Sequence, residues 1–226
     1  MTNFYKNTLL IIIIFVSNFG FSQSNEIKVK FIGNCGLYMT DGKSNFYIDF
    51  PYKSGAHNYM EYDKSEIDSI KDNAIFIFTH RHADHYSNKL LKKLTGQKFD
   101  PWNIEELEKL GESIPDFDIQ AFKTQHKVFG VSFKHYSYLI TWHGKKIYIS
   151  GDTENSDTFA LQKDIEWAFV PAWLFTDAVQ KGVNVYDISE MYAIYHIGPN
   201  DQITNDENNP QIKLLDKQGE IITIPY

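Results

Sequence analysis

The sequence contains a single cysteine among its 226 residues, so little in it can be held by covalent links. One cysteine cannot form an internal disulfide, and it cannot build the thiolate cluster of a structural zinc site. The fold must therefore depend on its hydrophobic core. Cys35 itself lies between apolar residues and glycine, ahead of a segment with the character of a strand. This setting favours the role of a small buried residue over that of a nucleophile.

Positive charge is also scarce, because 22 Lys and Arg residues face 29 Asp and Glu residues and the net charge is -7. Arg81 is the only arginine. Proteins that hold a nucleic-acid backbone concentrate Lys and Arg on one face, so we expect no nucleic-acid partner. The length suits one globular α/β domain with a substantial core, and no repeat or low-complexity linker divides it.

Long hydrophobic runs are missing except near the N-terminus. The run Leu9–Val16 is preceded by Lys6 and followed by the small residues of Gly20–Ser22. It is too short for a membrane span, which needs about 20 apolar residues. The pattern predicts a signal peptide over residues 1–22 and a mature domain over residues 23–226, with a buried N-terminal helix as the alternative. We therefore expect a periplasmic or secreted protein without a stable membrane span after cleavage.

A metal-binding motif follows the apolar segment Ala74–Phe78, which has the pattern of a buried strand. His80 and His82 are two residues apart and project to the same side of an extended chain, so they can hold one ion. Asp84 and His85 come where the chain leaves the strand and can reach a second ion. A solvated polar loop is the alternative interpretation. The density of metal-binding side chains favours a metal site.

The rest of the chain alternates strands with a few short helices. Strands are predicted over residues 27–32, 37–40, 46–49, 74–78, 119–123, 133–142, 146–150, 167–170, 191–196 and 221–224. Helices are predicted over residues 65–71 and 87–94, and in a third segment that Asn103 caps and Gly111 ends. Residues 176–181 show no decisive pattern, and residues 201–209 are polar and predict a loop.

Three more candidate ligands stand at or beyond the ends of predicted strands. His126 follows the strand over residues 119–123, Asp152 follows the strand over residues 146–150, and His196 ends the strand over residues 191–196. Polar residues in such positions gather at one rim of a sheet, where distant segments build a single site. Together with the motif they supply enough side chains for two ions.

With these residues in place, the sequence resembles the metallo-β-lactamase-fold hydrolases. Their pattern is His-x-His-x-Asp-His, then a later His, a later Asp and a last His, and all seven positions are filled. The segments Phe31–Asn34, Asp84–Ser87 and Tyr148–Thr153 are most similar to the branch of L-ascorbate-6-phosphate lactonase and N-acylphosphatidylethanolamine-hydrolysing phospholipase D. The resemblance implies an α/β fold, a four-layer αββα sandwich with the metal site at the rim of its two sheets.

The resemblance also implies a division of the ligands between two divalent ions. The first ion would be held by His80, His82 and His126, the second by Asp84, His85 and His196, with Asp152 bridging them. A hydroxide between the ions would cleave a small-molecule ester, lactone, amide or phosphodiester, and Asp84 would orient it or accept its proton. Zinc is the expected metal, and manganese and iron are compatible with the same donors.

Several other residues have expected roles around this site. Asp49 ends a strand and is expected either to support the metal loop through a hydrogen bond or to cap a turn. His57, Trp173 and Phe175 are expected substrate contacts. His135 and His143 fall in a predicted hairpin, where solvent-facing or turn positions are the expected ones.

Other functions remain open at this level. A thioesterase resembling hydroxyacylglutathione hydrolase would share the seven ligand types, but the sequence around His126 lacks the Pro-Gly-His-Thr run of that branch. Di-iron oxidases of this fold generally carry Glu where this chain has His82. An iron-dependent dioxygenase, a β-lactam hydrolase and a non-catalytic metal-binding protein complete the alternatives. The sequence determines neither the substrate, nor the metal, nor the oligomeric state.

Overall fold

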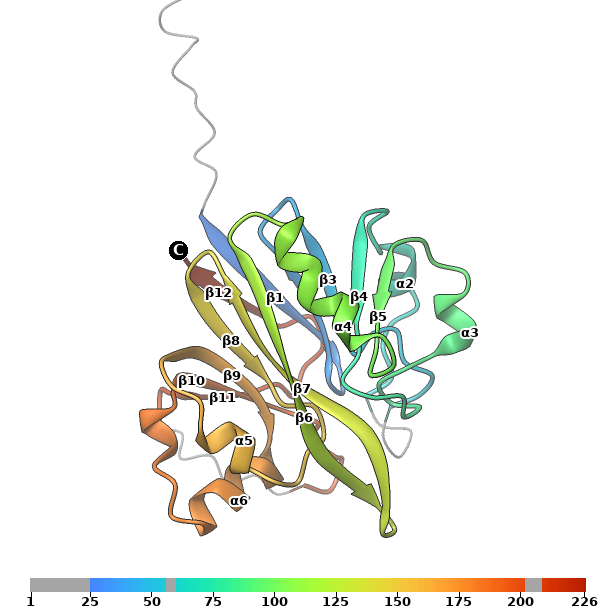
Figure 1. The fold of residues 1–226 in the computed structure, drawn as a ribbon. Helices are drawn as coiled ribbons and strands as arrows, with labels where there is room; N and C mark the ends of the chain where they lie inside the picture. The colour runs from blue at the N-terminus through green and yellow to red at the C-terminus, as the bar shows by residue number, and fades with distance from the viewer. Residues whose placement is uncertain (1–24, 56–59, 202–208) are drawn as a thin grey trace, which may run out of the picture.

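Two mixed β-sheets packed face to face form the centre of the protein (Figure 1). This computed structural model describes residues 25–55, 60–201 and 209–226. The expected signal peptide over residues 1–22 and the candidate substrate contact His57 lie outside the described residues. The predicted α/β class is confirmed by the two sheets and the short helices around them.

The first sheet has six strands and combines a meander with two parallel additions. From one edge, the first four strands pair antiparallel with one another, and the last two strands are added in parallel. The spatial order is β12 (Ile221–Pro225), β1 (Glu26–Gly33), β2 (Gly36–Thr40), β3 (Asn45–Ile48), β4 (Ala74–Ile77) and β5 (Gln97–Phe99). The predicted edge strand near the C-terminus is confirmed as β12.

The second sheet also has six strands, three antiparallel and then a run of parallel neighbours. The spatial order is β11 (Ile212–Leu214), β10 (Ser189–Tyr195), β9 (Ile165–Pro171), β8 (Lys145–Ile149), β7 (Val131–Trp142) and β6 (Phe117–Val128). The predicted hairpin is confirmed, but β6 is longer than expected. His126 therefore lies inside this strand rather than beyond it.

Helices are few and short. They are α2 (Ser65–Asp68), α3 (Asn88–Leu91), α4 (Ile104–Leu107), α5 (Asp157–Ala160) and α6 (Ala172–Gln180), with 3-10 turns η2 (Glu108–Glu112) and η3 (Val185–Asp187). Helices α2 and α3 cover the outer face of the first sheet, α5 and α6 cover that of the second, and the segment of α4 and η2 packs against the main core. None of the helices in the described ranges is long and apolar enough to cross a membrane.

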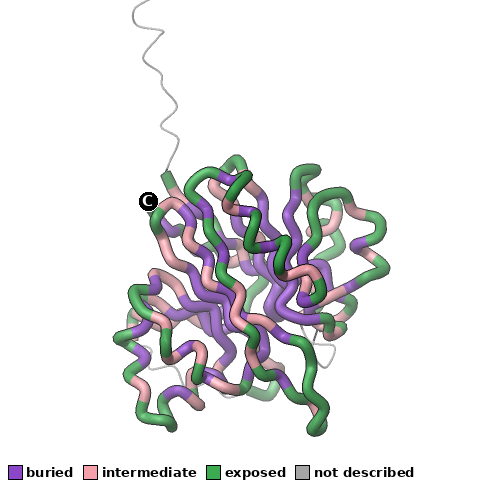
Figure 2. Tube along the Cα trace, viewed as in Figure 1, coloured by how far each residue is buried: buried purple, intermediate pink, exposed green. Residues whose placement is uncertain are grey.

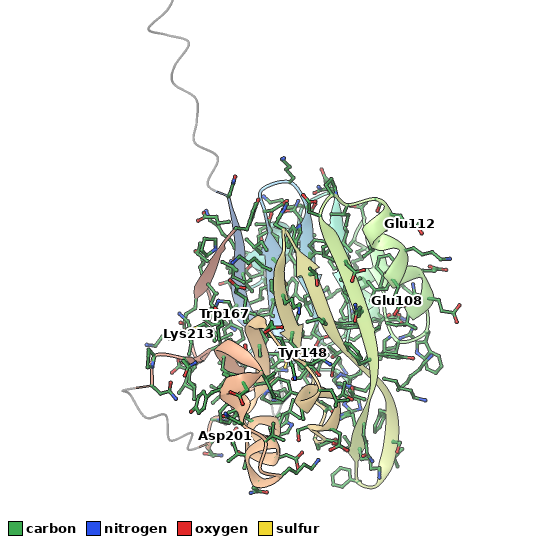
Figure 3. All side chains as sticks on the ribbon, turned by 60° about the vertical axis from the view of Figure 1, so that its left-hand side comes forward. Glu108, Glu112, Tyr148, Trp167, Asp201 and Lys213 are labelled. Carbon is green, nitrogen blue, oxygen red and sulfur yellow. The ribbon has the colours of Figure 1, made fainter. Side chains whose placement is uncertain are left out.

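Side-chain alternation along each strand creates three apolar clusters. In β4, Ile75 and Ile77 face the main core between the sheets, whereas Phe76 points to the outer face, beneath α2 and α3. In the second sheet, Tyr148 points outward and packs with α5 and α6 (Figure 3). The order of layers is thus helix, sheet, sheet, helix, and the predicted αββα sandwich is confirmed.

The main core is closed by large aromatic rings. Trp142 is fully buried, with the ring of Phe46 at 5.0 Å and that of Phe117 at 5.9 Å. Most buried residues lie along the strands, and most residues of the turns are exposed (Figure 2). The acidic side chains of Glu108 and Glu112 are exposed on η2 (Figure 3).

Two helix predictions need correction. The side chain of Asn103 does not cap α4, because it accepts a hydrogen bond from the Asp100 amide (2.8 Å) and donates to the Lys98 carbonyl (2.9 Å). Gly111 lies within η2 instead of ending a helix. Residues 176–181, for which no element was predicted, belong largely to α6, which begins directly after Pro171.

Candidate metal centre

The seven candidate ligands come together at one end of the two sheets, although four chain segments supply them. The motif follows β4, and the amide of Tyr86 donates to the carbonyl of His82 (2.8 Å), which coils the loop so that its side chains converge. Asp152 follows β8 and His196 follows β10, while His126 reaches the group from within β6. The expected convergence of strand ends is therefore present.

A first cluster consists of His80, His82 and His126, with one ring nitrogen of each within 4.8 Å of the others. Nε2 of His126 and Nδ1 of His82 are 3.2 Å apart. His80 and His126 are buried and His82 is partly exposed. Three imidazoles facing one point, and no carboxylate among them, form a neutral nitrogen site.

Neighbouring side chains aim these imidazoles inward. Nδ1 of His80 is 3.1 Å from the hydroxyl of Thr79, which itself donates to Asp49 (2.7 Å) and so accepts from the ring. Nδ1 of His126 likewise donates to Glu154 (2.9 Å). The rings of His80 and His126 thus carry the proton on Nδ1 and direct the lone pair of Nε2 into the cluster, whereas His82 faces it with Nδ1. Nε2 of His80 is buried without a hydrogen-bond partner among the described residues.

A second cluster contains His85, Asp152, His196 and Cys35, with one donor atom of each within 4.8 Å of the others. Oδ2 of Asp152 is 3.1 Å from Nε2 of His85 and 3.3 Å from Nε2 of His196. Asp84 borders the same group, since its Oδ2 lies 3.2 Å from His196 Nε2 and 3.7 Å from His85 Nε2. Oxygen and nitrogen donors are therefore mixed here.

Asp49 links the motif to the strand beside it. Its side chain is fully buried and accepts from the Thr79 amide (2.7 Å), the Thr79 hydroxyl (2.7 Å) and Nδ1 of His85 (2.9 Å). The expected support of the metal loop through hydrogen bonding to Asp49 is confirmed. It sets the tautomer of His85, whose Nε2 is buried and has no hydrogen-bond partner among the described residues.

The two clusters differ in charge. In the first, burial lowers the pKa of His80 well below its usual range, and burial and His126 lower that of His82. In the second, burial opposes protonation, but Asp152 and Asp84 outweigh it and raise the pKa of His196 to about 10. His85 shows the same balance, because the nearby carboxylates of Asp152 and Asp49 outweigh its burial and raise its pKa. Nearby carboxylates thus raise the histidine pKa values in the second cluster, whereas burial lowers those in the first.

His135 was expected in a solvent-facing or turn position, and this prediction is wrong. The residue is fully buried, its Nε2 accepts from the Asp152 amide (3.0 Å), and its Nδ1 donates to the hydroxyl of Thr124 (2.7 Å). Burial lowers its pKa to about 3, so the ring is neutral. A Cβ on Gly151 would lie 2.5 Å from Nε2 of His135, which requires glycine there. The alternation that places His135 on the same strand face as buried Ser137 was the available sequence clue.

The clusters lie at the base of an open cleft of about 360 Å³. Its walls are formed by Ser54, Gly55, His82, Ala83, Asp84, His126, Val128, Asp152 and His196. The ring of Trp173 lies 5.0 Å from that of His196 and donates to the Thr153 carbonyl (3.2 Å). Phe175 instead packs on Tyr192 (5.1 Å) in the outer apolar cluster of the second sheet. His143, as expected, lies in a turn, where it contacts Asp41 (3.0 Å).

The donor set fits divalent metal ions. Buried imidazole nitrogens without partners, lone pairs held inward by outer hydrogen bonds, and carboxylates at the second cluster are what imidazole- and carboxylate-binding ions require. Two clusters side by side offer two such positions. The site also opens to a cleft, as a catalytic position must and a structural one need not.

Comparison with solved structures identifies the fold. The chain is similar to the metallo hydrolase Igni18 from Ignicoccus hospitalis, with TM-score 0.61 and 16% identity over 89% of this chain and 99% of that one. It is similar to the metallo-β-lactamase-fold protein YhfI from Bacillus subtilis, with TM-score 0.56 and 15% identity over 88% and 99% of the two chains. The isothiocyanate hydrolase from Delia radicum gut bacteria matches with TM-score 0.61 and 14% identity over 88% and 100%.

No protein-family model matches the chain, and neither does any curated protein sequence. The structural matches nevertheless cover nearly the whole described domain. The chain therefore has the metallo-β-lactamase fold, as its motif predicted. The branch within that fold stays a prediction.

Proposed function

We propose that the protein is a metal-dependent hydrolase that uses two divalent ions, held by His80, His82 and His126 and by Asp84, Asp152, His85 and His196. The observation that carries this proposal is the pair of adjacent donor clusters at the base of one cleft. A protein that only stored metal would not need both positions to open toward solvent. Two of the structurally similar proteins, the metallo hydrolase Igni18 and the isothiocyanate hydrolase, are hydrolases, which supports this assignment.

Divalent ions in such a pair lower the pKa of water and polarise a carbonyl or phosphoryl oxygen, which supplies the main chemistry of hydrolysis. The residues of the chain then have separate tasks. Asp84 lies on the cleft wall, and hydrogen bonding to His196 lowers its pKa despite burial, so it is an unprotonated acceptor near neutral pH. It is suited to orient the attacking water and to take its proton.

Outer residues keep this arrangement rigid. Asn34 donates to the Asp84 carbonyl (3.0 Å), and its own carbonyl accepts from the His196 amide (3.1 Å). Glu154 and Asp49 hold the histidines. The substrate is proposed to be a small ester, lactone, amide or phosphodiester, since the cleft is of small-molecule size. The N-terminal apolar run supports the further proposal that the protein is exported and acts in the periplasm or outside the cell.

The test is metal analysis of purified protein, followed by a screen of lactones, carboxylic esters, phosphodiesters, thioesters and β-lactams. We expect about two equivalents of metal and turnover of at least one class. The Asp84→Ala variant should retain the fold by circular dichroism and lose at least about 100-fold in turnover. Protein that binds no metal, or an Asp84→Ala variant as active as wild type, would refute the proposal. Oxygen uptake during turnover would instead assign an oxidase.

A further inference from the structure

The second cluster contains one side chain that the proposed ligand set does not use, the thiol of Cys35. This residue lies in the turn between β1 and β2 and is completely buried. Its thiol donates a hydrogen bond to Oδ1 of Asp152, with 3.7 Å between the sulfur and the oxygen. About 3.6 Å separates two donors of one tetrahedral zinc ion with ordinary bond lengths. The sulfur is therefore spaced from Asp152 as a ligand of the same ion would be.

The donors around this position lie close together. Sγ of Cys35, Nε2 of His196, a nitrogen of His85 and an oxygen of Asp152 lie within 4.8 Å of one another. Nε2 of His85 is fully buried, makes no hydrogen bond among the described residues and lies 3.1 Å from Oδ2 of Asp152, so this nitrogen also faces the position. Sulfur, nitrogen and oxygen are all donors that zinc accepts, and Asp84 borders the same group as a fifth donor.

Cys35 approaches from the closed side of the cluster. The cleft lining includes Asp84, Asp152 and His196 but neither Cys35 nor His85. Two hydrogen bonds of the neighbouring Asn34 fix the turn that carries the thiol. Its side chain donates to the Asp84 carbonyl, and its backbone carbonyl accepts from the His196 amide. Asp84 therefore faces an ion from the solvent side, and the thiol faces it from the protein interior.

We propose that Cys35 is a thiolate ligand of the second metal ion and makes that position selective for zinc. This inference rests on the proposed function, since it assumes that the second cluster binds metal. When the ion binds, the S–H bond breaks, the proton passes to solvent, and a sulfur–metal bond forms. Thiolate favours zinc and its spectroscopic substitute cobalt over manganese and magnesium, which prefer oxygen. The first cluster, with imidazoles alone, lacks this preference.

The test is titration of the metal-free full-length domain with Co²⁺, followed by absorption spectroscopy. A thiolate ligand produces a near-ultraviolet sulfur-to-cobalt charge-transfer band that imidazole and carboxylate ligands do not. We expect this band with only one of two bound equivalents. It should disappear in Cys35→Ser and Cys35→Ala and persist in Asp84→Asn. Both cysteine variants should release their second zinc ion to a chelator at least about tenfold more readily than wild type.

The outcomes separate this inference from the function on which it rests. Wild type that binds two cobalt ions without the band would overturn the thiolate assignment and leave the metal-dependent hydrolase intact. Equal affinity for the second ion in Cys35→Ala and wild type would do the same. Protein that binds no cobalt would overturn both. Because the band is measured first in wild type, the conclusion does not depend on the folding of any variant.

Discussion

Replacing Asp49 with Asn should weaken metal binding without any contact between this residue and a metal ion. Oδ2 of Asp49 accepts from the Thr79 hydroxyl and from Nδ1 of His85, and Oδ1 accepts from the Thr79 amide. An Asn side chain has only one acceptor oxygen. Whichever way its amide is turned, an NH₂ group faces a buried N–H donor.

The expected cost follows from these contacts. One buried donor left unpaired costs about 1–3 kcal/mol, and the lost charge weakens the bonds that remain. We therefore expect Asp49→Asn to lower the free energy of unfolding of the metal-free protein by about 3 kcal/mol. The ring of His85 would also lose its fixed tautomer, so affinity at the second cluster should fall about 10–100-fold.

The assay is competition with a chelator for metal affinity, together with urea denaturation of the metal-free protein. Asp41→Asn is a matched control, because Asp41 also accepts three hydrogen bonds, from the amides of Lys43 and Ser44 and from the ring of His143. It lies in the turn between β2 and β3, away from the metal centre. This control should lose stability and keep its metal affinity. Unchanged metal affinity in Asp49→Asn would refute the reasoning.

Further predictions concern the first ion, pH and the core. Glu154→Ala should lower affinity for the first ion about tenfold, as measured by chelator competition, whereas Glu112→Ala on exposed η2 should change nothing. The pKa of His196 is raised to about 10, so binding at the second cluster must displace its proton, and affinity should rise with pH between 7 and 10. Calorimetric titrations in which the metal affinity does not rise with pH would contradict this prediction. Trp142→Ala should cost about 3–5 kcal/mol in urea denaturation, and Trp102→Ala, 65% exposed, less than about 1 kcal/mol.

Sequence reasoning was strongest where local pattern and position agree. The spacing of His80 and His82 after an apolar strand, and polar residues near the ends of later strands, were sufficient to name the side chains that the structure brings together. The four-layer sandwich could be predicted because the motif resembles that of proteins with a known fold. These predictions succeeded since a site at a sheet rim depends on strand direction more than on fine packing.

The supporting residues were mostly missed, because their roles depend on contacts between distant strands. His135 contacts Asp152 through the pairing of β6, β7 and β8, which no local pattern reveals. Glu154 holds His126 from 28 residues away. The strand β11 is only three residues long and partly exposed, too short for a hydrophobic pattern. Helix α6 buries Leu174 and Ala178, a sparse stripe that its many aromatic residues obscure.

The length of the β6–β7 hairpin gives the first ion a role in local stability. The far end of this hairpin, residues 123–134, extends past the neighbouring strands (Figure 1) and is mostly exposed (Figure 2). His126 is the one residue in this range that is buried. A few contacts hold this end of the hairpin, among them the Thr153 hydroxyl on the Gln125 carbonyl (2.7 Å), His126 on Glu154 (2.9 Å) and Phe133 against His82 (4.2 Å). An ion bound by His126 would tie it to the body of the protein. Amide hydrogen exchange in the hairpin would then report metal occupancy, because each local opening must first release the ion.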